Sequence, residues 1–183
     1  MLFSRIEMLL RLLMSQADAD LVRDFHEAWS RASADRVDTV MSSLLSATGA
    51  RAVGWWRRVG EELELISFQA AADMPDDVRV GFMAATGRVA MSRIELGCVR
   101  AAAELQPVVA REDAAQRGLS GSASWLTRFG ASQSLALPII RDGVAVGVLA
   151  VATAKVFDET SPIWRTMTVI VAELAHVVPR GPE

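Results

Sequence analysis

The chain has little of the chemistry that catalytic and metal sites need. Cys98 is its only cysteine, so no intramolecular disulfide can form, which favours a reducing cytoplasm. His26 and His176 are its only histidines, and each lies near one end of the sequence. A structural metal site needs several closely spaced ligands. We therefore predict no metal site and interpret both histidines as helix-surface or interface residues.

Positive charge is not concentrated in any one segment. The chain has 19 basic residues, of which only Lys155 is a lysine, and 22 acidic residues, which gives a net charge of −3. Nucleic-acid-binding domains usually carry a clustered basic surface, so we predict no nucleic-acid partner. The apolar segment 1–14 is interrupted by Glu7 and Arg11, and it is shorter than the roughly 20 residues that span a bilayer. We therefore predict no membrane segment and a cytoplasmic location.

The first 32 residues predict one long amphipathic helix, because apolar residues recur at spacings of three and four. A helix of this length would extend beyond a small domain, so its free end needs a partner. We predict that residues 1–32 form a homodimer interface, since identical apolar stripes pair readily about a twofold axis. The residues predicted to form this interface are Ile6, Leu9, Leu10, Leu13, Leu21 and Phe25.

Hydrophobic residues make up 51% of the whole chain. After residue 32 their pattern predicts helices and strands of a single domain. Capping residues Ser33 and Asp35 begin a second helix, and Gly49 ends it. Residues 111–124 are rich in Ala, Gly and Ser and predict a mobile loop. The expected strands are Arg51–Val59, Leu63–Ala70, Val108–Ala110, Ser134–Ile140 and Val144–Thr153, and the other expected helices cover residues 75–85, 95–105, 125–129 (a single turn) and 161–178.

Four details indicate how the last two strands are arranged. Asp142-Gly143 predicts a two-residue hairpin turn, because both central positions of a type I′ turn need positive φ. Pro138 requires a strand edge or a bulge, and Gly147 leaves a gap in the strand where a helix or a ligand could approach closely. The strand from Val144 is apolar on both faces and should lie centrally. The sequence therefore predicts an α+β fold, a central antiparallel sheet of five to six strands with helices on its faces.

The order of these elements and their local sequences resemble the GAF family. Residues 130–151, GASQSLALPIIRDGVAVGVLAV, are similar to its pattern of Gly, Ser, an apolar-Pro-apolar step, a turn ending in Gly, and a Gly-apolar-Leu strand. Ser33–Trp56, Gly97–Asp113 and Phe157–Ala175 resemble other family segments in the same order. The resemblance covers residues 33–178, leaving 179–183 as a tail, and PAS domains share the architecture. It implies a regulatory module that senses a small molecule or binds a signalling partner, and that is not an enzyme.

The best-known GAF chemistries do not match this sequence. Members that attach a bilin usually have a Cys followed by His, whereas Val99 follows Cys98, so no covalent bilin is expected. Members that reduce methionine sulfoxide use several cysteines. Members that bind cyclic nucleotides often carry a signature that residues 155–159 echo, but this chain has no asparagine. We therefore do not expect a cyclic nucleotide, and haem bound through His176 would require its helix to face the pocket.

A candidate ligand site lies where the family places its pocket lid and wall. Its residues are Trp125, Arg128, Phe129, Ser132 and Ser134. An aromatic ring and a guanidinium beside hydroxyl groups suit a flat or anionic ligand. Alternatively, Trp125 and Phe129 plug the sheet face, and the module binds partners without a ligand. A third hypothesis is a thiol enzyme using Cys98, for which a buried, inert thiol is the alternative.

Overall fold

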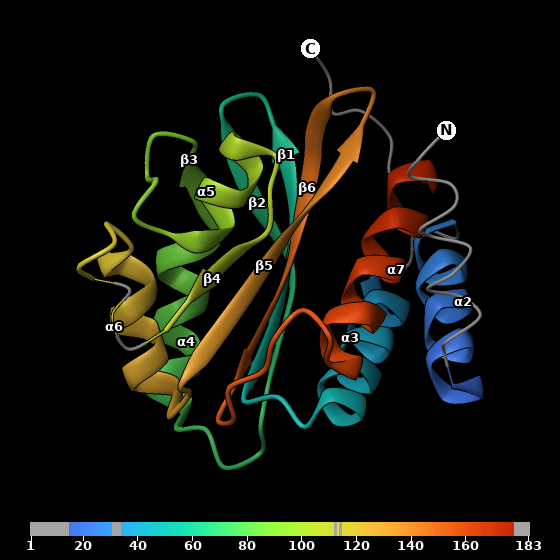
Figure 1. The fold of residues 1–183 in the computed structure, drawn as a ribbon, viewed down its shortest axis with the longest axis horizontal. Coiled ribbons are helices and arrows are strands. Elements are labelled where there is room, and N and C mark those ends of the chain that lie inside the picture. The colour runs from blue at the N-terminus through green and yellow to red at the C-terminus, as the bar shows by residue number, and fades with distance from the viewer. Residues whose placement is uncertain (1–14, 31–33, 112, 114, 178–183) are drawn as a thin grey trace.

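The computed structural model describes residues 15–30, 34–111, 113 and 115–177. Within them, six strands form one antiparallel sheet in the order β3-β2-β1-β6-β5-β4 (Figure 1). The strands are β1 (Ala52–Val59), β2 (Glu62–Ala70), β3 (Arg88–Ala90), β4 (Val108–Ala110), β5 (Gln133–Arg141) and β6 (Val144–Thr153). The predicted α+β class and the hairpins β1–β2 and β5–β6 are confirmed, whereas β3 was not predicted.

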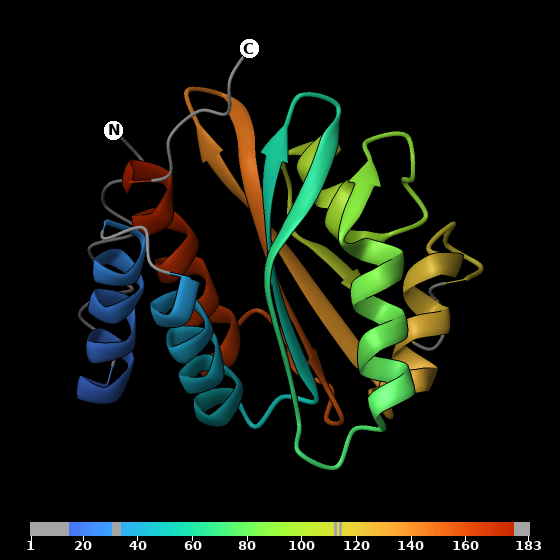
Figure 2. The ribbon, with the colours of Figure 1, turned by 180° about the vertical axis from the view of Figure 1, so that it is seen from behind.

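Helices cover both faces of this sheet (Figures 1 and 2). The terminal helices α2 (Gln16–Ser30), α3 (Ala34–Thr48) and α7 (Pro162–Val177) pack on one face. The internal helices α4 (Asp76–Thr86), α5 (Gly97–Glu104) and α6 (Ser120–Phe129) pack on the other. None of the helices in the described residues is long and apolar enough to cross a membrane.

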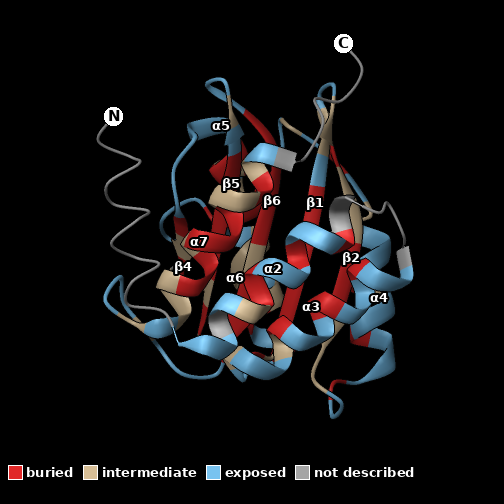
Figure 3. Ribbon diagram, turned by 90° about the vertical axis from the view of Figure 1, so that its right-hand side faces the viewer, coloured by how far each residue is buried: buried red, intermediate tan, exposed pale blue. Residues whose placement is uncertain are grey.

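The molecule therefore has two hydrophobic cores separated by the sheet. Figure 3 shows the helix surfaces buried toward the sheet and exposed on the outside. Trp55 lies in the core beneath the terminal helices, and its neighbour Trp56 lies in the core beneath the internal helices. The two residues lie on opposite faces because successive strand residues point to opposite sides of a sheet. β6 lies between β1 and β5, and its apolar side chains serve both cores.

The turn and the place of Pro138 in the last hairpin are confirmed, whereas the close approach at Gly147 is made by a neighbouring strand and not by a helix or a ligand. Asp142 and Gly143 both have positive φ, 51° and 78°, as a type I′ turn requires. Pro138 lies past the point where β4 stops pairing with β5, and a register shift follows at Ile139/Ile140. A Cβ on Gly147 would lie 2.6 Å from the Trp56 carbonyl oxygen, so β6 approaches β1 more closely than a side chain allows.

The N-terminal helix is present, but its packing corrects part of the dimer prediction. The described helix begins at Gln16, and Ile6, Leu9, Leu10 and Leu13 lie outside the described residues. Leu21 is 5% exposed and Phe25 0% exposed, and the Phe25 ring packs 5.9 Å from that of Trp55. These two side chains are core residues of their own chain, because α2 packs against α7 and α3. They are not a surface available for a second copy.

The predicted mobile loop over residues 111–124 is wrong at its C-terminal end, because α6 begins at Ser120. The first turn of α6 begins Ser120-Gly121-Ser122, and Ser and Gly by themselves disfavour a helix. Tertiary contacts hold the turn instead. The amide of Ser122 donates to the Glu95 carbonyl at 3.2 Å, and a Cβ on Gly121 would lie 2.8 Å from Leu96.

Candidate functional site

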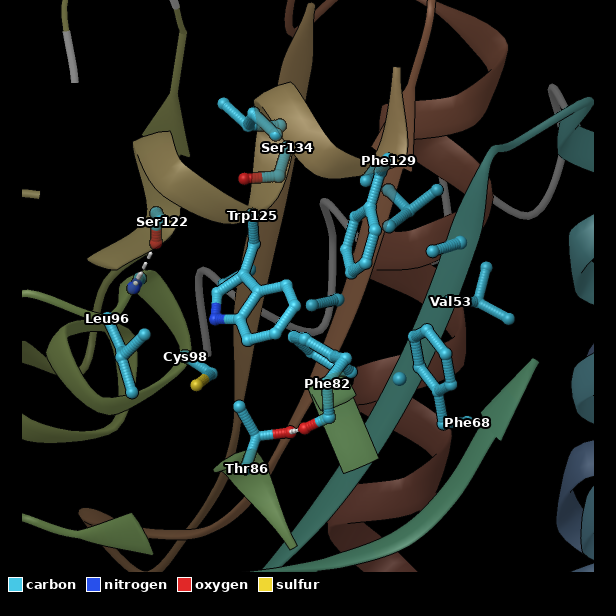
Figure 4. Close-up of a pocket in the computed structure, with 18 of the residues that line it drawn as sticks. Val53, Phe68, Phe82, Thr86, Leu96, Cys98, Ser122, Trp125, Phe129 and Ser134 are labelled. Atoms are coloured by element: carbon cyan, nitrogen blue, oxygen red, sulfur yellow. Dashed lines mark hydrogen bonds between the residues drawn. The ribbon is translucent and has the colours of Figure 1, made fainter. Parts of the chain in front are cut away.

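A small cavity of about 70 Å³ lies between the sheet and the internal helices (Figure 4). Strands β1, β2, β5 and β6 form its floor, and α4, α5 and α6 supply its other walls. Its lining residues are Ala52, Val53, Gly54, Trp56, Phe68, Phe82, Thr86, Leu96, Gly97, Cys98, Ser122, Trp125, Leu126, Phe129, Ser134, Ala136, Ala150, Val151 and Ala152. Every one of these side chains is uncharged at neutral pH.

The structure brings three of the five predicted ligand-site residues together. Trp125, Phe129 and Ser134 line the cavity. Arg128 is exposed, and its guanidinium lies 4.7 Å from the centre of the Trp125 ring, a cation–π contact made from outside the cavity. Ser132 does not line the cavity, and its amide donates to the Thr153 carbonyl at 2.8 Å. The Arg128 guanidinium is therefore not part of the cavity. It packs against Trp125 of α6, the helix that forms the lid of the cavity.

Five aromatic rings occupy most of the space on this face of the sheet. They belong to Trp56, Phe68, Phe82, Trp125 and Phe129, with centroids of neighbouring rings 4.6 to 6.1 Å apart. Such tilted and edge-on pairs add about 0.5–1.5 kcal/mol each to the burial of the rings. The remaining cavity is well below the roughly 300–1,000 Å³ of pockets for drug-sized ligands.

Trp56 is a pocket residue whose place in the site was not assigned from the sequence. Its Nε1 donates to the Thr86 carbonyl at 3.0 Å, which fixes the indole. The ring lies over Gly54, where a Cβ would be 2.4 Å from the Trp56 Cη2 atom. In the sequence, Gly54 stands two residues before Trp56 in the same predicted strand, so both lie on one face of the sheet. This spacing is a visible sign that the indole lies over the glycine.

Cys98 also lines the cavity, and the structure confirms that its thiol is buried. Burial away from water disfavours the thiolate and raises the pKa of Cys98 from 9.0 to about 12. The thiolate is the nucleophilic form of cysteine. At neutral pH this side chain therefore behaves as a small apolar group.

Polar contacts pin the lid of the cavity to α5. The amide of Gly97 donates to the Ser122 Oγ atom at 2.7 Å, shown as a dashed line in Figure 4. The Arg100 guanidinium donates to the carbonyls of Arg117 at 3.0 Å and Gly118 at 2.6 Å. These bonds hold the segment that leads into α6. Arg100 was not singled out in the sequence, because no motif marks an arginine whose partners are backbone carbonyls.

The residues that echo a cyclic-nucleotide signature lie away from this cavity. The Phe157 amide and carbonyl are both bonded to the buried Gln133 side chain, at 3.3 and 2.9 Å. Asp158 accepts bonds from the Thr160 amide and hydroxyl, which organise the turn before α7 and lower the pKa of Asp158. His176 is exposed on α7, on the opposite face of the sheet, so its helix does not face the cavity.

Comparisons with known proteins agree with this geometry. The sequence matches the model of the GAF domain over residues 34–176. No curated protein sequence matches the chain. The structure resembles the GAF domain from an Acinetobacter phosphoenolpyruvate-protein phosphotransferase, with 16% identity, a TM-score of 0.59, and coverage of 90% of this chain and 94% of that one.

Two further solved structures share the fold. A putative GAF sensor protein from Burkholderia vietnamiensis is 17% identical with a TM-score of 0.61, covering 91% of this chain and 94% of that one. The phycocyanobilin-bound GAF domain from a cyanobacterial phytochrome is 13% identical with a TM-score of 0.63, covering 89% and 94%. Identities this low show a shared fold and no more. The match to the family model covers most of the sequence, and this chain belongs to the GAF domain family.

Proposed function

We propose that this chain is the sensing module of a signalling protein, and that it binds a small molecule in the cavity beneath Trp125. GAF domains are a regulatory and sensory fold. The observation that carries the proposal is the cavity itself, which lies on one sheet face and is covered by α6, whose Trp125 and Phe129 rings pack over it and whose Ser122 is hydrogen-bonded to Gly97.

The size of the cavity supports a small ligand. The related phytochrome domain is described as bound to phycocyanobilin. Here about 70 Å³ remains among five aromatic rings, and Val99 follows Cys98. A ligand of bilin or nucleotide size would have to displace several of those rings, each packed against others.

The proposal is tested by melting the protein in the presence of a broad set of metabolites. A ligand that binds only the folded state must raise the melting temperature. Ser134→Leu should abolish such a shift, because residue 134 lines the cavity and the larger side chain fills it. Ser132→Leu is the matched control, since Ser132 lies two residues away and outside the cavity. A shift that persists in the Ser134 variant would place the ligand elsewhere.

A second candidate function is a protein-interaction module whose pocket is filled by its own side chains. The five packed rings favour it, because they already bury the sheet face without a ligand. This alternative predicts no compound-dependent rise in melting temperature. A rise of several degrees with one compound, lost in the Ser134 variant, would exclude it.

Dimerisation through the terminal helices remains part of the proposal, in a narrower form. The apolar face of α2 is used within its own chain, so dimerisation would depend on residues 1–14, including Ile6, Leu9, Leu10 and Leu13. A signalling protein partner, a cytoplasmic location and the absence of nucleic acid among its partners also remain proposals. A thiol enzyme has little support, because the Cys98 thiol is buried and protonated at neutral pH.

A further inference from the structure

We infer that the ligand is an uncharged molecule of a few heavy atoms that accepts a hydrogen bond from the indole N–H of Trp125. This inference rests on the proposed function and names the chemical class of the ligand. Three observations carry it: the lack of charge in the cavity, the contrast between two tryptophan N–H groups, and the size of the space.

No charged side chain lines the cavity. Its lining side chains are apolar or carry a hydroxyl, a thiol or an indole N–H. The Arg128 guanidinium contacts the Trp125 ring but does not line the cavity. The first amide of α5, which could bind an anion, already donates to Ser122 Oγ. An unpaired charge in such surroundings is strongly disfavoured relative to water.

The two tryptophans of the cavity differ in how their N–H groups are satisfied. Trp56 Nε1 donates to the Thr86 carbonyl at 3.0 Å, so this indole has a structural partner. Trp125 makes ring contacts with Phe82, Phe129 and Arg128, and no described residue accepts a hydrogen bond from its Nε1. In Figure 4 its nitrogen lies on the side of the ring toward Leu96 and Cys98. An indole N–H is a donor only, so a ligand that replaces water beside the Trp125 nitrogen has to offer an acceptor.

Three hydroxyls line the same cavity as this N–H, and that of Thr86 already donates to the Phe82 carbonyl at 2.8 Å. Ser122 Oγ accepts a hydrogen bond from the Gly97 amide, so the Ser122 hydroxyl can still donate its own proton. Ser134 Oγ has no hydrogen-bond partner among the described residues and points toward the Trp125 side of the cavity (Figure 4). Hydroxyls can donate as well as accept. The polar side of the cavity therefore suits an oxygen acceptor such as a carbonyl.

The volume limits the body of the ligand. The cavity of about 70 Å³ is about half the size of an engineered apolar cavity of about 150 Å³ that binds benzene. By that comparison the space holds roughly three or four heavy atoms without movement of the rings. Acetone has this size, an apolar body and one carbonyl acceptor, and it serves as the probe.

The experiment compares three molecules of four heavy atoms each: acetone, acetate and isopropylammonium. Each is added to the ¹⁵N-labelled full chain while the indole N–H signals are followed by NMR. Trp125→Phe and Trp56→Phe assign the two cavity signals. We expect acetone to shift the Trp125 signal downfield along a saturable curve and to leave the Trp56 hydrogen bond in place. Acetate and isopropylammonium should bind at least about tenfold more weakly, because their charge has no partner in the cavity.

A Trp125 shift that rises linearly with acetone, like the signals of exposed groups, would overturn the inference. So would saturable binding of acetate that is as tight as that of acetone. These failures are distinguishable from failure of the proposed function. If a charged metabolite raises the melting temperature and Ser134→Leu abolishes that rise, the cavity is a sensor site and only the ligand class is wrong.

Discussion

Trp55 and Trp56 stand next to each other in β1, and each fixes a different half of the molecule. Trp55 packs on Phe25 beneath the terminal helices. Trp56 packs edge-on against Phe82 and bonds to Thr86 in α4, beneath the internal helices. A single dipeptide thus joins both cores through the backbone of one strand. The hydrogen bond to Thr86 gives the Trp56 indole a structural partner, whereas the Trp125 N–H has none among the described residues.

Trp56→Phe is expected to lower the free energy of unfolding by about 1–3 kcal/mol, because the buried Thr86 carbonyl loses its donor. Trp125→Phe makes the same chemical change where the N–H has no described partner, and should cost less than about 1 kcal/mol. Urea denaturation of the two variants measures both values. An equal loss of unfolding free energy in the two variants would mean that the hydrogen bond from Trp56 to Thr86 does not stabilise the fold.

Cys98 provides a second prediction, on pH. In the unfolded chain the thiol ionises near its ordinary pKa of 9.0, while in the folded chain its pKa is about 12. Above pH 9 the unfolded state therefore releases a proton that the folded state keeps, and raising the pH favours unfolding. The wild type should lose up to about 1.4 kcal/mol per pH unit relative to Cys98→Ala above pH 9. Parallel stability curves for the two proteins between pH 8 and 10 would show that the thiol is accessible.

At the scale of elements, the two hairpins meet along β1 and β6, where Gly147 removes a side chain that could not fit. A Cβ there would meet the Trp56 carbonyl at 2.6 Å and the Ile139 Cδ1 atom at 3.3 Å. Gly143, in the turn of the same hairpin, has a φ of +78° and nothing within 4 Å of an added Cβ. The first glycine is needed for space and the second for its backbone conformation.

Gly147→Ala should therefore destabilise the protein more than Gly143→Ala. We expect about 2–3 kcal/mol for the first, because two central strands must separate, and about 1 kcal/mol for the second. Chemical denaturation of both variants checks this order. If Gly143→Ala lowers the free energy of unfolding more than Gly147→Ala does, then β1 and β6 leave room for a side chain at residue 147, and the close contact is contradicted.

Regular elements could be predicted from the sequence, and elements held by distant contacts could not. The Asp142-Gly143 turn and the apolar run of β6 depend on local patterns, and both are correct. β3 is three residues long and exists through its pairing with β2, while the first turn of α6 depends on Glu95 and Gly97. The site follows the same division. Trp125, Phe129 and Ser134 were predicted, whereas Arg128 could not be placed outside the cavity without knowing how α6 packs.

At the scale of the whole molecule, the cavity and the terminal helices lie on opposite faces of one sheet. β5 links them directly, because Ser134 and Ala136 line the cavity while Leu135 and Leu137 pack in the core beneath the terminal helices. α7 packs on β5 and β6 and against α2. A shift of β5 on ligand binding would therefore displace α7, which packs on it. This arrangement supports a signal that leaves the domain through the terminal helices.

Deleting residues 1–14 tests the dimer part of the proposal. The deletion leaves Leu21, Phe25 and the rest of the α2 core face in place, so the melting temperature should fall little. The molar mass by light scattering should fall from that of a dimer to that of a monomer, because the residues of α2 that are described as exposed are polar, charged or alanine. An unchanged dimer mass would place the interface outside residues 1–14.

Hydrogen exchange with and without a ligand tests the central claim most directly, namely that occupation of the cavity is sensed across the sheet. The ligand is the compound that raises the melting temperature most, and Ser134→Leu is the control. We predict slower exchange in α6 and also in α7 of the wild type, and no change in either helix of the variant. Protection of α6 alone, or equal protection in the variant, would contradict the claim.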